Sequence, residues 1–373
     1  EKPNVVLFII ESYGREYSGA FNPNTNIEGY RSYTPFIDSL ARHSLIFTNA
    51  YANGNKSIHG MSSILSGIPS FKDAFTSSPY ANQKIESLVS VLESIGYHTS
   101  FFHGAENGSM GFLGYSNILG IDKYFGRKEY NNDSEFDGYW GIWDEPFLQF
   151  MKDKLDEEKE PFFSTVFTIS SHEPYIIPKK YKDIFSEGDN SMHKCVRYTD
   201  YALKRFFDEA KKESWFNNTI FVMVADHANL IYYPEYRKEL NLNTVPILFY
   251  HPDGRFSDIN NSLAQQIDIY PTILDMIGYD KKFRSWGRSL ISDKENPFVI
   301  KYSGFYYFFY DNYVCCFDGE KVIGFYELSD ASMENNLINE KRDLMYFIEK
   351  KCKAFIQDYM NRIIDLNLAE NRF

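Results

Sequence analysis

Runs of apolar residues alternate with helix-like patterns along the first three quarters of the chain. The apolar runs read as buried strands and cover residues 5–10, 45–50, 98–103, 162–169, 220–224 and 245–250. Apolar positions at helical spacing cover residues 35–41, 57–65, 85–95, 145–155, 192–212 and 264–277. Uninterrupted apolar strands that alternate with helices are typical of parallel sheets buried on both faces. We therefore predict an α/β fold with a mostly parallel central sheet and helices on both of its faces.

The last quarter of the chain has a different pattern. Short β-like segments fill residues 298–328 and are broken at Ser303-Gly304 and at Asp318-Gly319-Glu320, which fits a hairpin turn. A long helical pattern over residues 339–366 follows. We predict a main domain over residues 1–292 and a small C-terminal α+β subdomain over residues 293–373, packed on the main sheet.

Composition indicates a globular protein and argues against one class of partner. Apolar residues make up 43% of the chain and charged residues 24%, which suits a large core. The formal net charge of −12 argues against nucleic-acid binding, because phosphate backbones are held by clustered Lys and Arg. The four cysteines are too few and too irregular for a disulfide framework or a zinc site, so we expect free or buried thiols.

The ends of the sequence carry little targeting information. No apolar stretch reaches the roughly 20 residues that a membrane-spanning helix needs, and no signal peptide is recognisable. The chain starts at Glu1, only a few residues before the first strand and without Met. We therefore expect a domain excised from a longer protein.

Polar residues with metal-binding side chains follow two of the predicted strands. Glu11 comes directly after one apolar run, and Asp226 and His227 follow another. Ligand sites of open α/β sheets gather at the carboxyl ends of such strands. Two carboxylates and an imidazole would hold a divalent cation and leave a position open. The alternatives are an Asp cap beside an exposed His, and a Glu11 that is only solvated or paired.

Ser57 lies at the predicted start of a helix, in the segment Gly54-Asn-Lys-Ser57. The segment is neither a P-loop nor a nucleophile elbow, because the glycines of those motifs are missing. A serine there could bind the same metal ion and, as an alkoxide, attack phosphorus or sulfur. The alternative is an N-cap serine that satisfies the free backbone amides of the helix.

Three further residues are candidates for substrate binding. His172 follows a predicted strand, so it could donate a hydrogen bond to a substrate phosphate, or it could be a structural loop residue held by Glu173. His103 ends another predicted strand and is a weaker candidate. Trp140 could form the wall of a pocket, although burial in the core is the more common fate of Trp.

Several of these segments together resemble the alkaline-phosphatase-like, sulfatase-fold superfamily. Within it they look most like the branch of lipoteichoic acid synthases and phosphoglycerol transferases. The resemblance covers roughly residues 3–292 and makes residues 1–292 the catalytic domain. It rests on NVVLFIIES at 4–12, GNKS at 54–57, GYHTSFFHG at 96–104, WGIWDE at 140–145, SHEPY at 171–175, ADH at 225–227, QIDIYPT at 266–272 and WGRSL at 286–290.

The resemblance implies a role for each candidate. Glu11, Asp226 and His227 would hold one divalent ion with Ser57, commonly Mn²⁺ in this branch, with Mg²⁺ or Zn²⁺ as alternatives. The nucleophile, usually Thr in lipoteichoic acid synthases, falls on Ser57. His172 matches a histidine that binds substrate phosphate, and Trp140 falls near an aromatic substrate-site residue. Sulfatases that use formylglycine need Pro and Arg two and four residues after the nucleophile, where this chain has His59 and Met61.

The resemblance also implies a reaction and a location. A phospholipid such as phosphatidylglycerol would donate a phosphoglycerol group through a covalent Ser57 intermediate, and a glycan or a glycerophosphate polymer would accept it. The chain would be the extracytoplasmic domain of a protein anchored in the membrane by segments outside this sequence. A hydrolase (phosphodiesterase, phosphatase or sulfatase-like), a phosphoethanolamine transferase and a non-enzymatic domain that binds anionic glycans or lipids are the alternatives.

Overall fold

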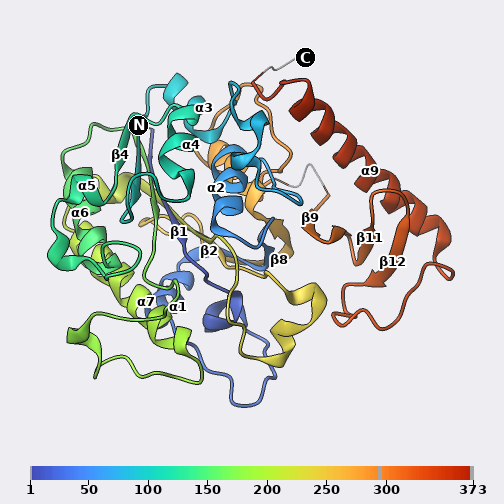
Figure 1. Ribbon diagram of the computed structural model, residues 1–373, viewed down its shortest axis with the longest axis horizontal. Coiled ribbons are helices and arrows are strands. Elements are labelled where there is room, and N and C mark those ends of the chain that lie inside the picture. Colours follow the sequence, from blue (N-terminus) through green and yellow to red (C-terminus); the bar gives the residue numbers. More distant parts are fainter. Residues whose placement is uncertain (1, 293–295, 370–373) are drawn as a thin grey trace.

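The predicted strands pair into one large sheet at the centre of the molecule (Figure 1). The computed structural model describes residues 2–292 and 296–369. Within these residues the sheet has eight strands in the order β4-β3-β5-β1-β6-β7-β2-β8. Their bounds are β1 Asn4–Ile10, β2 Ser44–Tyr51, β3 His98–His103, β4 Lys123–Phe125, β5 Phe162–Phe167, β6 Thr219–Ala225, β7 Ile247–Tyr250 and β8 Asp258–Gln265.

The pairing of the strands confirms the prediction of a mostly parallel sheet. β1 lies between β5 and β6 and runs parallel to both, and β2 runs parallel to β8. β7 is antiparallel to both of its neighbours, β6 and β2. Because β7 reverses the direction twice, β2 points the same way as β1 and β6. The carboxyl ends of these three strands therefore open at one edge of the sheet.

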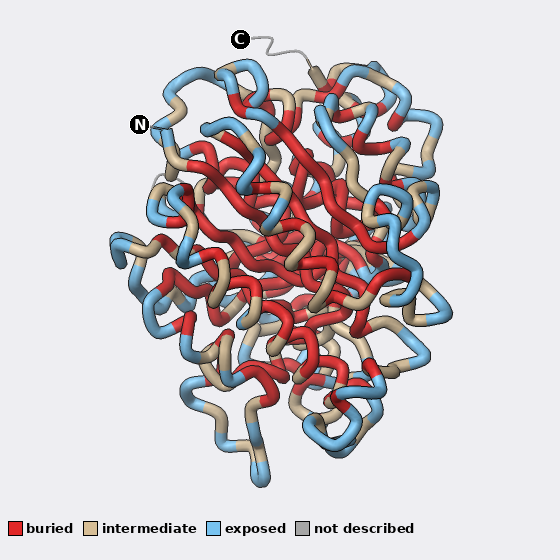
Figure 2. The backbone as a smooth tube through the Cα atoms, turned by 90° about the vertical axis from the view of Figure 1, so that its left-hand side faces the viewer, coloured by how far each residue is buried: buried red, intermediate tan, exposed pale blue. Residues whose placement is uncertain are grey.

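Helices cover both faces of this sheet, as the sequence predicts. On β1, Val5, Leu7 and Ile9 face a core that includes α2, α3, α4 and α8, while the intervening residues face α1, α6 and α7. The central strands are buried along their length (Figure 2). The helix bounds are α1 Pro35–Ala41, α2 Ser57–Ser66, α3 Leu88–Ser94, α4 Phe112–Leu119, α5 Arg127–Tyr130, α6 Asp144–Asp156, α7 Ser191–Ala210 and α8 Ile269–Met276.

One prediction is wrong, and two elements were not foreseen. The segment 264–277 is not a single helix, because residues up to Gln265 belong to the edge strand β8 and α8 begins at Ile269. The carboxylate of Asp268 accepts a hydrogen bond from the backbone amide of Gln265 (3.0 Å), which fixes the turn between the two elements. The short strand β4 and the helix α4 lie in a part of the chain for which the sequence predicted no element.

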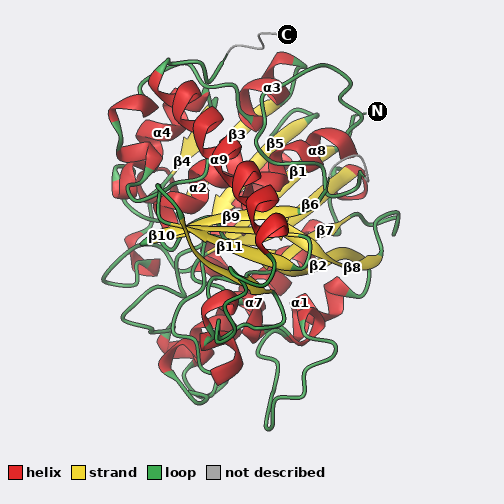
Figure 3. Ribbon diagram, turned by 90° about the vertical axis from the view of Figure 1, so that its right-hand side faces the viewer, coloured by secondary structure: helices red, strands yellow, loops and turns green. Residues whose placement is uncertain are grey.

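A second, antiparallel sheet and a long helix form the C-terminal part, as predicted (Figure 3). Gly304 and Gly319 lie in the first and last turns of this sheet and have positive φ angles, which glycine adopts without strain. The boundary predicted between residues 292 and 293 adjoins residues 293–295, which lie outside the described residues. The bounds are β9 Phe298–Ser303, β10 Phe305–Tyr310, β11 Tyr313–Phe317, β12 Val322–Glu327 and α9 Arg342–Ile364.

The small sheet is joined to the main sheet by buried polar contacts. Asn53, in the loop after β2, donates from its side chain to the backbone oxygen of Ile300 (2.8 Å) and to Gln265 Oε1 (2.9 Å). The ammonium group of Lys301 donates to the backbone oxygen of Leu242 (3.2 Å). It also lies 5.7 Å from the ring centre of Tyr51 and 5.0 Å from that of Tyr307. The loop that leads to Ser57 is therefore anchored on the C-terminal sheet.

Two other expectations concern the cysteines and the membrane. All four cysteines are free and buried, as expected. Cys315 and Cys316 point to opposite faces of the small sheet, into two different cores. Among the residues that the structure describes, no helix is long and apolar enough to span a bilayer.

A candidate metal-binding active site

Glu11 lies at the carboxyl end of β1 and is held by the loop that follows β5. It is buried, with 2% of its surface exposed. Its backbone amide donates to Thr168 Oγ1 (3.0 Å), and its backbone oxygen accepts from Ser171 Oγ (2.6 Å). Because the backbone is held on both sides, the direction of the Glu11 side chain is fixed without a contact to its carboxylate.

Asp226 and His227 lie at the carboxyl end of β6, beside Glu11. Asp226 Oδ1 accepts hydrogen bonds from the backbone amides of Ser12 (2.7 Å) and His227 (2.8 Å). Asp226 Oδ2 is buried and has no hydrogen-bond partner within the described chain. Gln266 supports the strand end from behind, because its side-chain amide donates to the backbone oxygens of Ala225 and Asp226, each at 2.7 Å.

Ser57 is the first residue of α2 and points at the two carboxylates. Its Oγ donates to Glu11 Oε2 (2.9 Å) and lies 3.4 Å from His227 Nε2. The N-cap alternative is wrong, because the N-cap residue is Lys56 and Ser57 directs its hydroxyl away from the helix amides. Gly60 brings the helix close, since a Cβ there would lie 2.9 Å from the Cα and Cβ of Asp226.

The side chains at this point fit a divalent metal ion. Ligand atoms of Glu11, Asp226 and His227 all lie within 4.8 Å of one another. His227 Nδ1 donates to the backbone oxygen of Ala228 (3.0 Å), so the lone pair of Nε2 is free for a ligand bond. Nε2 lies 3.2 Å from Asp226 Oδ2 and 3.7 Å from Glu11 Oε1. Two oxygens and one nitrogen with an open position suit Mn²⁺, Mg²⁺ or Zn²⁺.

The electrostatics of the cluster agree with that fit. Burial, and after it the charge of Glu11, raises the pKa of Asp226 to about 7. Two buried acids beside each other are costly when both are ionised, and a cation between them offsets that cost. The unpartnered Asp226 Oδ2 is the atom that such an ion would satisfy.

His172 and Trp140 lie together beside the loop that grips Glu11. Their ring centres are 4.1 Å apart, and Trp140 Nε1 donates to the backbone oxygen of Glu173 (2.7 Å). His172 Nδ1 donates to the same backbone oxygen (3.1 Å), so its Nε2 is free to meet a ligand. Their substrate-binding roles stay predictions.

His103 has a different environment. It is 1% exposed, and its Nδ1 donates to the backbone oxygen of Phe167 (3.0 Å). Its ring packs edge-on against Phe112, with 5.0 Å between the ring centres. His103 Nε2 is buried and has no partner within the described residues. A contact between His103 and substrate stays a prediction.

Asp144 supports the site, and the sequence pattern did not single it out. The Asp144 carboxylate accepts hydrogen bonds from the backbone amides of Ile169 (2.8 Å) and Ser170 (3.2 Å) and from Thr199 Oγ1 (3.1 Å). Burial raises its pKa to about 6. Asp144 thus clamps the loop whose next residue, Ser171, holds Glu11. The one signal in the sequence was its place in the segment that resembles the family, directly after Trp143.

Comparison with known proteins places this arrangement in a family context. A family profile described as Sulfatase matches residues 3–279. The lipoteichoic acid synthase-like protein YvgJ of Bacillus subtilis is 25% identical over 331 residues, which are 81% of this chain and 52% of that protein. A lipoteichoic acid synthase of Staphylococcus saprophyticus is 24% identical over 80% of this chain and 49% of its own length. The chain thus spans about half the length of these relatives.

Solved structures with similar folds agree. A Vibrio parahaemolyticus protein of the alkaline phosphatase superfamily aligns with a TM-score of 0.85 and 26% identity, over all of this chain and 89% of its own. The lipoteichoic acid synthase LtaP of Listeria monocytogenes aligns with a TM-score of 0.80 and 18% identity, over 99% of this chain and 94% of its own. At 18% identity, the second comparison supports the fold alone.

Proposed function

The chain belongs to the sulfatase family of the alkaline phosphatase superfamily, and from this premise we propose that it is a metal-dependent phosphoglycerol transferase. Its donor is a membrane phospholipid and its nucleophile is Ser57. The observation that carries the proposal is the Ser57 hydroxyl, 2.9 Å from Glu11 Oε2 in the cluster of Glu11, Asp226 and His227. Relatives named as lipoteichoic acid synthases support a phosphoglycerol donor.

The reaction has two displacement steps at one phosphorus atom. In the first, a bond forms between Ser57 Oγ and phosphorus while the bond from phosphorus to the diacylglycerol oxygen breaks. The hydroxyl proton of Ser57 starts on the side of Glu11, and diacylglycerol leaves with one proton, so the step is balanced. In the second, an acceptor hydroxyl attacks the same phosphorus, and Ser57 leaves as a hydroxyl again.

The side chains of this chain divide the remaining work. His172 presents its free Nε2 to a phosphoryl oxygen, and Trp140 holds the His172 ring in place. Glu11, Asp226 and His227 would hold the divalent ion, Mn²⁺ by resemblance and Mg²⁺ or Zn²⁺ by donor type. When bound, such an ion lowers the pKa of a hydroxyl beside it and offsets charge on the phosphoryl oxygens. The acceptor is a glycan or a glycerophosphate chain.

The proposal includes a location. A phospholipid donor requires the site to lie at a membrane surface, yet no helix in the described chain spans a bilayer. We place the domain on the extracytoplasmic face, held by membrane segments outside this sequence. This placement rests on the relatives, of which the chain covers about half.

Mass spectrometry tests the nucleophile directly. After incubation with phosphatidylglycerol and Mn²⁺, we expect a phosphoglycerol adduct on the peptide that contains Ser57. Ser57→Ala should abolish the adduct, whereas Ser63→Ala on the same helix should keep it, because the Ser63 hydroxyl bonds only to its own helix, at the backbone oxygen of His59 (2.9 Å). Full turnover by Ser57→Ala would refute the mechanism.

A hydrolase is the second candidate function, favoured by the Sulfatase match itself. The same site with water as acceptor would be a phosphodiesterase, a phosphatase or a sulfatase-like enzyme. Product analysis with and without a glycan acceptor separates the two, since a transferase forms a new phosphodiester only when the acceptor is present. Phosphatidylethanolamine in the same assay tests a phosphoethanolamine donor.

A further inference from the structure

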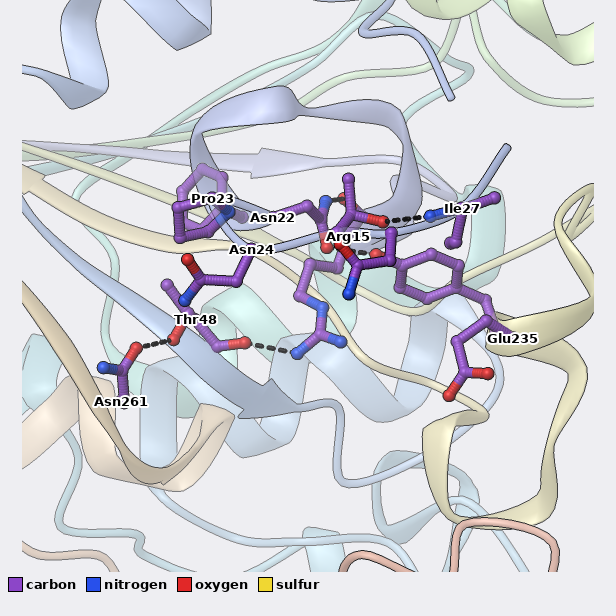
Figure 4. A pocket seen from close by; sticks show the side chains of 12 residues that line it. Arg15, Asn22, Pro23, Asn24, Ile27, Thr48, Glu235 and Asn261 are labelled. Carbon is purple, nitrogen blue, oxygen red and sulfur yellow. Dashed lines mark hydrogen bonds between the residues drawn. The ribbon is translucent and has the colours of Figure 1, made fainter. Parts of the chain in front are cut away.

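A second cavity lies beside the loops that follow β1 and β6 (Figure 4). Its volume is about 480 Å³, within the range typical of small-molecule sites. Arg15 comes from the loop after β1, Thr48 from β2, Asn261 from β8 and Glu235 from the loop after β6. The cavity is thus built by the two loops that continue from the candidate active site, together with the edge of the main sheet.

One side of the cavity is rigid because its polar groups already bond to one another. The Arg15 guanidinium donates to the backbone oxygen of Thr48 and lies 5.4 Å from the ring centre of Tyr236. The Thr48 hydroxyl donates to Asn261 Oδ1. The Asn22 amide donates to the backbone oxygen of Arg15 (2.9 Å). These contacts are visible in Figure 4 around the centrally placed Arg15.

The other side offers amide groups without partners. Asn24 and Asn26 are exposed, and their side chains make no hydrogen bond to any part of the chain that the structure describes. The amino group of Asn261 is also unengaged within the described residues, since only its oxygen accepts a bond. Each free amide offers donors and an acceptor a few ångströms apart. Such a set matches the paired hydroxyls of a sugar.

The charge of the lining excludes a strong phosphate site. Arg15 and Glu235 are the charged residues among those that line the cavity, and their charges are opposite. Arg15 is already engaged by Thr48 and Tyr236. Phosphate groups are usually bound by several cations or by free amides at a helix N-terminus, and the lining provides neither. The ligand class that fits is neutral and rich in hydroxyls.

The position of the cavity links it to the candidate active site. Arg15 follows Glu11 by four residues, and four residues span at most about 14 Å. A ligand in the cavity therefore lies within the reach of a short oligosaccharide from Ser57. We infer that this cavity binds a neutral sugar unit of the acceptor, which names the substrate class on the acceptor side and rests on the proposed function.

Ligand-observed NMR tests the binding without requiring turnover. The probes are maltose, cellobiose and lactose, with glycerol 3-phosphate and inorganic phosphate as anionic comparisons. We expect saturation transfer to at least one disaccharide and an affinity about ten-fold lower in Asn24→Ala/Asn261→Ala, the effect of losing about two hydrogen bonds. Asn117→Ala is the control, because Asn117 is exposed on α4 and does not line the cavity.

Each outcome decides for or against the inference. No disaccharide signal, an unchanged affinity in the double variant, or competition in which glycerol 3-phosphate binds more tightly than the sugars would overturn it. Ser57→Ala separates this inference from the function. If that variant keeps sugar binding and full turnover, the proposed nucleophile fails while the sugar site stands.

Discussion

At the residue scale, the site is defined by an acceptor atom that the protein leaves open. Asp226 Oδ1 is occupied by two backbone amides, while Oδ2 is buried without a partner in the described chain. Glu11 and His227 bring their ligand atoms to the same point. A buried carboxylate oxygen without a donor is costly, so the arrangement is explained by the cation that it fits.

Asp226→Asn tests this explanation with a nearly isosteric change. The two amides that bond to Oδ1 keep the oxygen of the new side chain, which turns its NH₂ group toward the position of the ion. We expect the affinity for Mn²⁺, measured by isothermal titration calorimetry, to fall about a hundred-fold or more. The increase in melting temperature on adding Mn²⁺ should disappear with it.

The control for this change is a surface acid. Asp133→Asn removes a carboxylate that pairs with Arg127 and has 70% of its side chain exposed. This variant should bind Mn²⁺ like the wild type. Equal Mn²⁺ affinity in Asp226→Asn and in the wild type would show that the metal, if any, binds elsewhere.

Sequence reasoning found the residues that follow strands and missed those that hold them. Glu11 and Asp226 were predictable because a polar residue directly after a buried run has few structural explanations. Asp144 and Ser171 act through backbone atoms of a loop, and their partners are decided only when α6, β5 and β1 come together. No local pattern in the sequence encodes such a contact.

At the scale of elements, the fit of α2 against the end of β6 places the nucleophile. A Cβ at position 60 would lie 2.9 Å from the backbone of Asp226, so the helix can pack there only with glycine. Glycine inside a helix costs about 1 kcal/mol relative to alanine. The chain bears that cost at the point where Ser57 must reach Glu11.

Gly60→Ala therefore has an effect opposite to the usual one. The gain in helix propensity is about 1 kcal/mol, but overpacking of this kind costs about 1–3 kcal/mol and displaces α2 from Asp226. We expect lower Mn²⁺ affinity and slower formation of the Ser57 adduct. Gly114→Ala in α4 is the matched control, because nothing lies within 4 Å of its added Cβ.

The control should raise the free energy of unfolding by about 0.5–1 kcal/mol, measured by urea denaturation, without changing Mn²⁺ affinity. If Gly60→Ala were stabilised in the same way and kept its Mn²⁺ affinity, the close approach of α2 would not matter for the site.

The elements themselves differ in how far local sequence predicts them. The central strands are continuous apolar runs, which only a sheet buried on both faces accommodates, so their type was predictable. β8 is rich in polar residues that are poor strand formers, including Asp258, Asn260 and Asn261. It becomes a strand because it pairs with β2 at the edge of the sheet, a partner far away in the sequence.

At the scale of the whole molecule, a buried lysine ties the two sheets together. Lys301 is 4% exposed, and burial lowers the pKa of its ammonium group to about 8. The unfolded chain keeps the ordinary value of 10.5 and therefore binds more protons between these pH values. Stability from this group rises as pH increases from about 8 to about 10.5, because the cost of the buried charge disappears.

Lys301→Met tests this dependence. We expect the difference in unfolding free energy between wild type and variant to change by up to about 3 kcal/mol in favour of the wild type across that pH range. Urea denaturation at several pH values measures it. Lys321→Met is the control, because Lys321 is exposed at a turn of the same sheet. A difference that stays constant with pH would contradict a buried, charged Lys301.

The bond from Asn53 to Ile300 has a consequence for the smallest piece of the protein that can work. The family profile stops at residue 279, before the small sheet begins. A truncation there would remove the carbonyl that Asn53 reaches (2.8 Å), only four residues from Ser57. The autonomous folding unit is therefore larger than the conserved profile, and the terminal sheet serves as a brace for the nucleophile.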